Sequence, residues 1–318
     1  MSFRVRDAVR CLVFCCALSC ASACYSESTT LRVMTFNLWH GGDAGGQPMS
    51  QSVKVIQASK ADIVGLQETR GFASEEQSRP NRGEAISKEL GWNYYPQSGR
   101  RGILSRYPID DSMKSEDGVY IELSSGFKLA FFNVHFPAAP YQPYQLLKIK
   151  YGEAPFVETE SQAIEWANKS RGKQVDRVVR GLSQVLKSNT PAILTGDFNE
   201  PSFEDWTVQA VQAGKCPLAV RYPATAKVVE VGMRDVFRTV HKDEVASPGW
   251  TWTPTTKPND PQDKHDRIDF VFASKHWQLI NCQRVGEPGN ADIVVSPWPS
   301  DHRAVVAELK LQNSIAEQ

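Results

Sequence analysis

The sequence predicts a soluble α/β protein whose β-structure is mixed, and three observations support this. The chain has 318 residues, of which 41% are hydrophobic and 23% are charged, as is ordinary for a globular enzyme with one large domain. After Thr30, short apolar runs typical of strands alternate with stretches that have helical periodicity. Two neighbouring runs, Val119–Leu123 and Leu129–Val134, lie close enough in sequence to form a hairpin, so antiparallel pairing is expected beside parallel pairing.

The individual elements follow from composition and from stop signals along the chain. Apolar runs rich in β-branched and aromatic residues predict the strands. These are Leu31–Leu38, Ile63–Gln67, Tyr94–Gln97, Gly102–Ser105, Val119–Leu123, Phe127–Val134, Ala192–Gly196, Arg267–Ala273 and Arg303–Leu309. The predicted helices are Ser50–Lys60, Arg82–Leu90 (which ends at Gly91), Val157–Lys169 and Val175–Lys187. No repeat or linker divides the sequence, so residues 31–311 are expected to form one domain.

The segment after the strand at Phe127–Val134 is unusual in composition. Phe136–Tyr151 is rich in Pro, Tyr and Gln and directly follows His135. Long connections in compact domains are more often functional than decorative. We therefore expect residues 136–171 to be an insertion that shapes a substrate site, and a surface insertion without consequence is the alternative.

The N-terminus has the order of a secretory signal peptide. A run containing several arginines precedes the short apolar stretch Cys11–Ser19, and the small residues Ala21–Ala23 suit cleavage. The apolar stretch is too short to span a membrane. Residues 1–23 are therefore predicted to direct the chain out of the cytoplasm, to the exterior, the periplasm or the cell envelope.

Cysteine usage fits export. Cys24 would begin the mature chain, where a bacterial lipoprotein carries its lipid, so it is a candidate anchor. Cys216 and Cys282 would either form a disulfide in an oxidising compartment or stay two separate buried thiols.

The formal net charge is zero, so no overall basic field attracts the chain to nucleic acid. We expect a monomer.

Polar residues stand at the ends of the predicted strands, which is where sites assemble in α/β proteins. Any single one of them is equally well explained as a satisfied polar group at a strand terminus. Together they form a set of only four residue types, which is harder to dismiss. The set comprises Asn37, Glu68, His135, Asp197, Asn199, Asp269, Asp301 and His302.

The acidic members of this set fit the hydrolysis of a phosphate ester. That reaction needs a divalent cation to neutralise the phosphoryl oxygens, and Mg²⁺ prefers one or two carboxylates together with several waters. Glu68 is the natural ligand, and Asp301 is a candidate for a second one. Asp197, beside Asn199 on a turn after a strand, suits the task of orienting or deprotonating the attacking water.

The histidines fit the same reaction. His135 and His302 can donate hydrogen bonds to the charge that develops on the phosphoryl group. A carboxylate behind a histidine fixes its tautomer and supports its protonated form, and Asp269 is a candidate for this role behind His302. No two histidines are four residues apart, so a helical zinc site is not indicated.

Two further residues are candidates for substrate binding. Arg70, two positions after Glu68, can reach a phosphate, although a solvated arginine explains it equally well. Trp252 in the run GWTWTP can stack on a base or a sugar, although an aromatic side chain packed at the rim of the core is the simpler explanation.

The ordered motifs that surround these residues resemble a known family. The set resembles the endonuclease/exonuclease/phosphatase superfamily, which includes pancreatic-type DNases, abasic-site endonucleases, inositol-polyphosphate 5-phosphatases and bacterial sphingomyelinases. GDFN or SDH alone would be a weak signal, whereas the ordered set is specific and spans Leu31 to Leu309. The motifs are LRVMTFNLWHGG with Asn37, DIVGLQET with Glu68, GILSRYPI, NVHF with His135, LTGDFNEP with Asp197 and Asn199, DRIDFVF with Asp269, and SDHRAVV with Asp301 and His302.

The resemblance implies a DNase I-like four-layer sandwich, in which two packed mixed β-sheets are flanked by helices and the site lies at one edge of the sheets. It also implies that Glu68 binds Mg²⁺ (with Mn²⁺ or Ca²⁺ as alternatives), that Asn37 lies beside the ion and the substrate, and that Asp301 helps to hold the metal region. The resemblance also implies that Asp197 orients the attacking water and that Asn199 contacts the phosphate.

The remaining roles that the resemblance implies concern the histidines. His302 would contact the phosphate and share in acid–base chemistry, backed by Asp269. His135 matches a histidine that DNases and sphingomyelinases have after this strand. Abasic-site endonucleases lack a histidine there, so the resemblance to that branch is weaker.

The function expected from the sequence is a secreted Mg²⁺-dependent phosphoesterase that hydrolyses a phosphodiester or phosphomonoester with an activated water. A DNase-like nuclease and a sphingomyelinase-like phospholipid phosphodiesterase are narrower alternatives. The substrate is accordingly a nucleic acid, a phospholipid head group, or a sugar or inositol phosphate. A non-catalytic binding module of the same fold is the least favoured hypothesis, because such a protein is expected to have lost some of the catalytic set.

Overall fold

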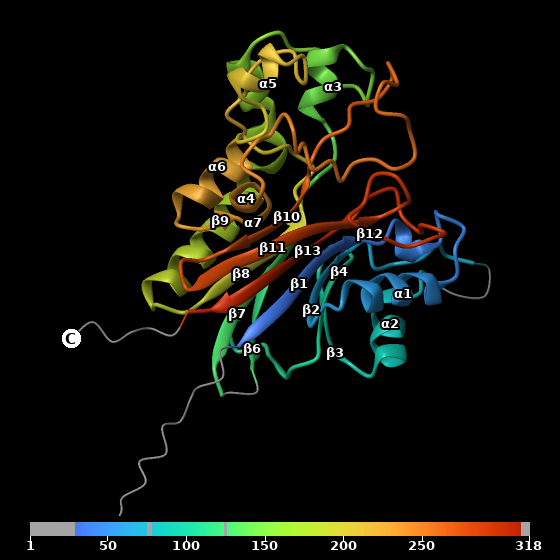
Figure 1. Ribbon diagram of the computed structural model, residues 1–318, viewed down its shortest axis with the longest axis vertical. Coiled ribbons are helices and arrows are strands. Elements are labelled where there is room, and N and C mark those ends of the chain that lie inside the picture. The colour runs from blue at the N-terminus through green and yellow to red at the C-terminus, as the bar shows by residue number, and fades with distance from the viewer. Residues whose placement is uncertain (1–28, 75–77, 124–125, 313–318) are drawn as a thin grey trace, which may run out of the picture.

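Two β-sheets pack face to face in this protein, and helices cover the outer face of each sheet (Figure 1). The computed structural model describes residues 29–74, 78–123 and 126–312 of the chain. The predicted signal peptide at residues 1–23 and the candidate lipid anchor Cys24 lie outside the described residues. The predicted α/β sandwich of two mixed sheets flanked by helices is confirmed.

The first sheet contains both the first and the last strand of the described chain. Its strands run in the order β12-β11-β13-β1-β2-β4-β3, with β1 parallel to β2 and antiparallel to β13. Two helices, α1 (Met49–Ser59) and α2 (Arg82–Leu90), cover its outer face. The strands are β1 Thr30–Asn37, β2 Ile63–Gln67, β3 Asn93–Gln97, β4 Arg101–Ser105, β11 Trp277–Gly286, β12 Ile293–Val294 and β13 Ala304–Leu311.

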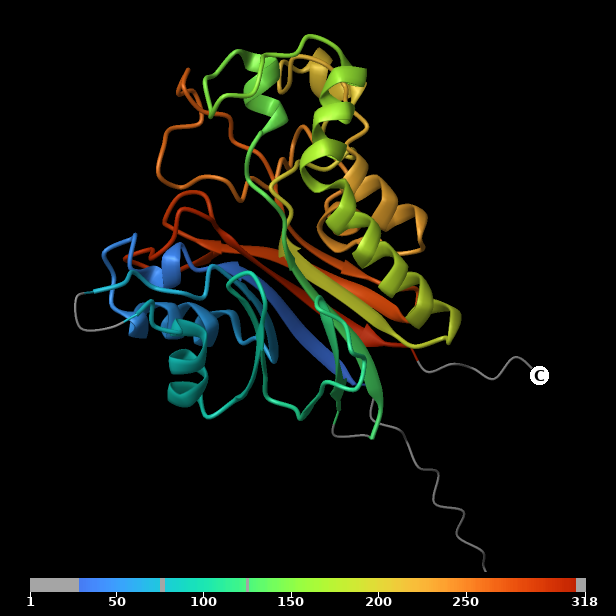
Figure 2. The ribbon, with the colours of Figure 1, turned by 180° about the vertical axis from the view of Figure 1, so that it is seen from behind.

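The second sheet has the strand order β5-β6-β7-β8-β10-β9, with β7 parallel to β8. The helices α4 (Glu160–Lys187) and α6 (Pro223–Glu230) cover its outer face, and they lie on the opposite side of the molecule from α1 and α2 (Figure 2). The strands are β5 Ile109–Asp110, β6 Gly118–Glu122, β7 Lys128–His135, β8 Ala192–Asp197, β9 Arg234–Asp235 and β10 Asp269–Ala273. The remaining helical pieces are a 3-10 turn at His40–Gly42, α3 Gln142–Leu147, α5 Val208–Gln212 and α7 Val236–Val240.

Strand periodicity explains why apolar side chains fill three layers, one between the two sheets and one between each sheet and its helices. Along β1, Leu31 and Val33 face the second sheet, whereas Met34 and Phe36 face the outer helices. Every second side chain of a strand points to the same face, so each strand contributes to two clusters. Burying one such side chain stabilises the fold by roughly 1.5–3 kcal/mol, so the two sheets are held firmly against each other.

The structure corrects two expectations about the elements. One continuous helix, α4, replaces the two helices expected at Val157–Lys169 and Val175–Lys187. Its start is set by a capping box between Thr159 and Gln162, and the interior Gly172 is tolerated because the helix packs against the sheet. The strand β11 is not among the expected elements, because polar residues interrupt its apolar pattern. Its pairing with β13 shifts register between Leu279 and Asn281.

Two smaller points concern the cysteines and membranes. Cys216 and Cys282 are both free and buried, and they belong to different hydrophobic clusters. The alternative of two separate thiols is therefore the observed one. In the part of the chain that the structure describes, no helix has both the length and the apolar character needed to cross a membrane.

Strand register brings the polar strand ends to one edge of the sandwich. The last paired residues of β7 and β8 are His135 and Asp197, and Asp269 of β10 pairs with Asp197 from the other side. In the first sheet, Asn37 ends β1 beside Gln67, which ends β2. The long segments around α3 and before β10 lie beyond this edge, in green and orange in Figure 1. The fold thus places a site between strand ends and loops.

Candidate active site

Asp197 lies at the centre of the polar cluster and is fully buried. The amide Nδ2 of Asn37 donates to its Oδ2 at 2.9 Å, and the backbone N–H of Asn199 donates to its Oδ1 at 2.9 Å. The amide Nδ2 of Asn199 also donates to the backbone carbonyl of Phe136 at 3.0 Å. Burial raises the pKa of Asp197 to about 7, although His302 works in the opposite direction. This carboxyl group is therefore fixed in orientation and is able to exchange a proton near neutral pH.

His302 and Asp269 form a buried pair beside Asp197. The His302 Nδ1 lies 2.8 Å from Asp269 Oδ2, and its Nε2 lies 3.7 Å from Asp197 Oδ2. Because Nδ1 faces a carboxylate, that nitrogen carries a proton. Burial lowers the pKa of His302, but Asp269 and Asp197 outweigh this and raise the pKa well above its usual value. The two carboxylates therefore favour the protonated form of His302.

His135 approaches Asp197 from the end of β7. Its Nε2 lies 3.5 Å from Asp197 Oδ2. Burial lowers the pKa of His135 to about 4. The pKa values of the two histidines at this site are thus shifted in opposite directions, that of His135 down by burial and that of His302 up by its two carboxylates.

Glu68 and Asp301 form a second, acidic part of the site. The backbone N–H of His40 donates to Glu68 Oε2 at 3.0 Å. Asp301 Oδ1 is buried, and in the described part of the chain it has no hydrogen-bond partner. Burial raises the pKa of Asp301 to about 6. Burial alone would raise the pKa of Glu68, but His135 and the His40 N–H outweigh it and lower the pKa.

The backbone at two of these residues is strained. Glu68 and Asn199 have φ angles of 53° and 48°, in the left-handed region that residues other than glycine rarely adopt. Such conformations cluster at functional sites, where the surrounding structure holds them. Here the strand that precedes each residue is completely buried, so the chain must turn sharply to bring each side chain into the site.

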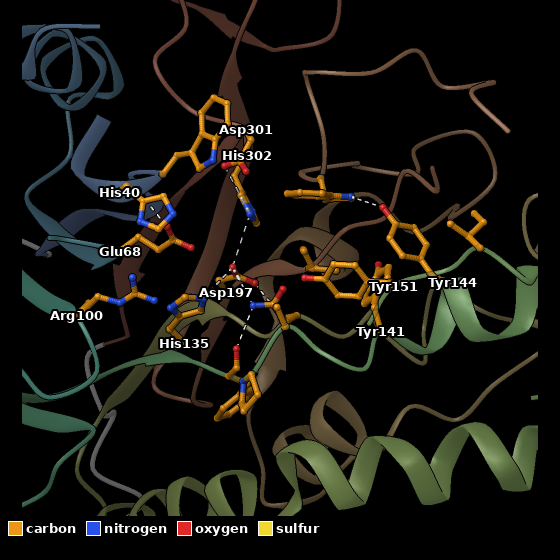
Figure 3. A pocket seen from close by; sticks show the side chains of 18 of the residues that line it. His40, Glu68, Arg100, His135, Tyr141, Tyr144, Tyr151, Asp197, Asp301 and His302 are labelled. Carbon is orange, nitrogen blue, oxygen red and sulfur yellow. Dashed lines mark hydrogen bonds and ion pairs between the residues drawn. The ribbon is translucent and has the colours of Figure 1, made fainter. Parts of the chain in front are cut away.

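A pocket of about 650 Å³ opens above these residues. Figure 3 shows two contrasting sides: His40, Glu68 and Arg100 lie opposite Tyr141, Tyr144 and Tyr151, with Asp197 and His302 between them. We call the strand-end residues Asn37, Glu68, His135, Asp197 and His302 the polar floor; all of them line the pocket except Asn37, which bonds Asp197. We call Tyr141, Tyr144, Tyr151 and Trp252 the aromatic wall.

The residues expected to bind substrate are placed differently from one another. The structure brings the whole acidic and histidine set together, and Trp252 lines the pocket with its ring 5.0 Å from the ring of His302. Arg70 is exposed and is not among the lining residues, because it pairs with Asn81 outside the pocket. Arg100 lines the pocket in its place.

The sequence pattern of the Endonuclease/Exonuclease/phosphatase family matches residues 34–302, which include every residue of the polar floor. The chain belongs to this family. Members of the family are hydrolases that act on phosphoester bonds. A Caenorhabditis elegans protein described as uncharacterized is 28% identical over 305 residues, covering 89% of this chain and 92% of its own length.

Solved structures of family members show the same fold. An endonuclease/exonuclease/phosphatase from Beutenbergia cavernae is 18% identical, with a TM-score of 0.55, and covers 89% of this chain and 72% of its own. One from Bacteroides vulgatus is 17% identical, with a TM-score of 0.55, and covers 89% of this chain and 100% of its own. An AP endonuclease from Archaeoglobus fulgidus is 19% identical, with a TM-score of 0.51, and covers 87% of this chain and 98% of its own.

The hydrogen bonds that hold the aromatic side chains beside the site escaped sequence reasoning. Tyr141 and Trp206 donate hydrogen bonds to the buried Asp266, at 2.8 and 3.0 Å, and Tyr144 and Trp252 donate to Asp263. These contacts join segments more than 50 residues apart, except for the one from Trp252. The only signal in the sequence was the unusual density of tyrosines after His135.

Proposed function

We propose that this member of the family is a secreted, Mg²⁺-dependent phosphoesterase that hydrolyses a phosphodiester or phosphomonoester by attack of an activated water. The observation that carries the proposal is the position of Asp197, buried between Asn37, His135 and His302 at the floor of the pocket. Export rests only on the signal-like order of the first 23 residues and stays a prediction.

Glu68 and Asp301 would hold the metal ion, with Asn37 nearby. Asp301 Oδ1 is a buried carboxylate oxygen without a hydrogen bond among the described residues, which suits a cation that binds hard oxygen donors. A second cluster consists of Asp197, Asp269 and His302, but most of its ligand atoms already have partners. His302 Nδ1 bonds one oxygen of Asp269, and Asn37 and Asn199 donate to the two oxygens of Asp197, which leaves Asp269 Oδ1 as the one carboxylate oxygen of these two residues without a hydrogen bond among the described residues. Bound Mg²⁺ would neutralise charge on the phosphoryl oxygens, and Mn²⁺ or Ca²⁺ would find the same donors.

The residues of the polar floor would divide the proton chemistry between them. Asp197 accepts a proton from the attacking water, and burial raises its pKa to about 7, as suits a general base near neutral pH. The Nε2–H of His302 donates a hydrogen bond to a phosphoryl oxygen, and Asp269 holds the ring in that orientation. Asn199 Nδ2 donates both to the Phe136 carbonyl and, at 3.3 Å, to Asp197 Oδ2, so Asn199 helps to orient Asp197 through its side chain and its backbone N–H.

The first test compares bis-p-nitrophenyl phosphate with p-nitrophenyl phosphate, each with Mg²⁺ and with EDTA. We expect turnover with Mg²⁺ and its loss with EDTA, because the acidic residues alone would repel a charged phosphate. Glu68→Gln and Asp301→Asn should raise the Mg²⁺ concentration that gives half-maximal rate, whereas Asp176→Asn, on the surface of α4, should not. Turnover that is insensitive to EDTA would contradict the metal-dependent proposal.

The same comparison narrows the substrate. Turnover of the diester alone would direct further work to nucleic acid and phospholipid substrates, as for the nuclease and sphingomyelinase-like alternatives. Turnover of the monoester alone would direct it to sugar and inositol phosphates.

A further inference from the structure

The pocket is much larger than a phosphate group requires. Its volume of about 650 Å³ lies within the range of pockets that enclose whole drug-sized ligands, roughly 300–1,000 Å³. The polar floor accounts for one side of this space only. The opposite side, formed by the aromatic wall, must therefore contact the part of the substrate that is not the reacting phosphate.

The aromatic wall is held in place by a carboxylate outside the set of predicted site residues. Tyr144 Oη donates to Asp263 Oδ1, and Trp252 Nε1 lies 3.3 Å from both that oxygen and Tyr144 Oη. Thr256 donates to the other oxygen of Asp263. The polar tips of two aromatic side chains are thus already bonded, so what the wall offers a ligand is ring surface.

Tyr151 completes the wall and is the part most open to a ligand. Its ring lies 5.7 Å from that of Tyr144 in an edge-to-face arrangement, and 45% of the residue is exposed. Tyr144 in turn packs edge-to-face on Tyr141 at 4.9 Å. The result is a row of rings from α3 to the mouth of the pocket, and an exposed aromatic face beside a polar centre is suited to stacking a flat group.

Charge decides which kind of flat group fits. Arg100 and Lys150 line the same pocket, and neither forms an ion pair within residues 29–74, 78–123 and 126–312. The acidic residues of the pocket, Glu68, Asp197 and Asp301, lie on the side of the polar floor, and Lys150 is the charged neighbour of Tyr151 in the chain. A cationic head group stacked on the aromatic wall would be repelled by Lys150, although an aromatic wall by itself can bind cations. An anionic ligand with a planar ring satisfies both the cations and the ring surfaces.

We infer that Tyr144, Tyr151 and Trp252 form a subsite for a planar ring carried by an anionic phosphoester, next to the position of the reacting phosphate. This inference rests on the proposed function, because it takes the polar floor as the phosphate site. Asp263 acts as a positioning residue for this subsite. Both tyrosines of the ring subsite belong to the segment 136–171, so the function of this segment is to bind the ring of the substrate.

The test is binding of two phosphonates that cannot be hydrolysed at the P–C bond, measured by calorimetry with Mg²⁺ present. Phenylphosphonate and methylphosphonate share the charged group and differ in the ring. We expect the wild type to bind phenylphosphonate about tenfold more tightly, since stacking on one aromatic side chain is of this order. Tyr151→Ala and Trp252→Ala should each reduce that ratio severalfold.

Phe156→Ala is the matched control. Phe156 lies on the same segment, is 49% exposed and is not among the residues that line the pocket, so its removal should leave the ratio unchanged. Asp263→Asn should lower the ratio less than Trp252→Ala, because it loosens the wall without removing a ring.

The outcomes separate this inference from the proposed function. Equal binding of both phosphonates by a protein that hydrolyses p-nitrophenyl esters would overturn the ring subsite and leave the phosphoesterase intact. Failure to bind either phosphonate, together with no hydrolysis, would overturn both. A ratio that falls in Tyr151→Ala but not in Phe156→Ala would support the subsite.

Discussion

The polar floor and the aromatic wall of the pocket face each other but are built in different ways. The floor consists of residues at or next to the ends of buried strands, and the sheet register fixes the place of His135 and Asp197 to a single pairing. The wall stands on α3 and on loops, and side-chain hydrogen bonds to Asp263 and Asp266 hold it. Chemistry that tolerates little displacement is thus placed on the rigid scaffold, and the contacts that select a substrate are placed on segments that can vary.

A buried ion pair connects the two regions. Arg171 of α4 donates to the backbone carbonyls of Ala138 and Pro140, at 3.2 and 3.1 Å, at the base of the wall. Its guanidinium lies 3.7 Å from Glu200, which directly follows Asn199 of the site. Substitutions can therefore alter the polar floor alone, or alter the contact between the polar floor and the aromatic wall at Arg171 and Glu200.

The largest effect is expected from Asp197→Asn in the floor. Loss of the proton acceptor should lower kcat by about 10²–10⁴. The melting temperature should change by only a few degrees, because burial already disfavours the charged carboxylate. Steady-state kinetics and thermal unfolding measure the two quantities, and a variant with near wild-type kcat would remove Asp197 from the mechanism.

Arg171→Met removes the contact between Glu200 and the segment that carries the aromatic wall, and we expect it to loosen that segment. The Ala138 carbonyl and Gln142 Oε1 lose a donor and Glu200 loses its opposite charge, whereas the Pro140 carbonyl keeps its bond from Gln142 Nε2. We therefore expect a loss of about 3–5 kcal/mol in the free energy of unfolding. In the folded fraction, KM should rise more than kcat falls. Denaturant unfolding and kinetics test this, with Arg180→Met on the exposed face of the same helix as the control. Unchanged stability would show that Arg171 does not anchor the wall.

The smallest effect is expected from Glu200→Gln, and it depends on pH. Burial raises the pKa of Glu200 from 4.5 to about 7, although Arg171 opposes the change. Between these values the folded state keeps a proton that the unfolded state has lost, so this group reduces stability as pH rises from about 4.5 to 7. Glutamine resembles the protonated form, so the variant should equal the wild type near pH 5.

Above pH 7 the Glu200→Gln variant should be more stable than the wild type by roughly 1–3 kcal/mol. Denaturant unfolding at pH 5 and pH 8 gives the comparison, and the exposed Glu165→Gln supplies the control. A difference that does not change with pH would mean that Glu200 is charged throughout, held by Arg171.

The sequence by itself determined the fold class and the residues of the floor. Each strand is a short apolar run, and a polar residue at its end, such as Asn37 or Asp197, marks an edge of the sheet without knowledge of its neighbours. The local sequence pattern is sufficient for these predictions, because the side chains of a strand alternate between its two faces and the apolar run stops where the strand ends.

Only the tertiary structure decided the wall, the pairing of charges and the place of Arg100. Tyr141 meets Asp266 across 125 residues, and Tyr144 meets Asp263 across 119, so no local signal identifies these partners. The same holds for Arg70, which stands near Glu68 in sequence but outside the pocket in space. A side chain's neighbours across the sequence are set by packing of the whole chain, and periodicity says nothing about them.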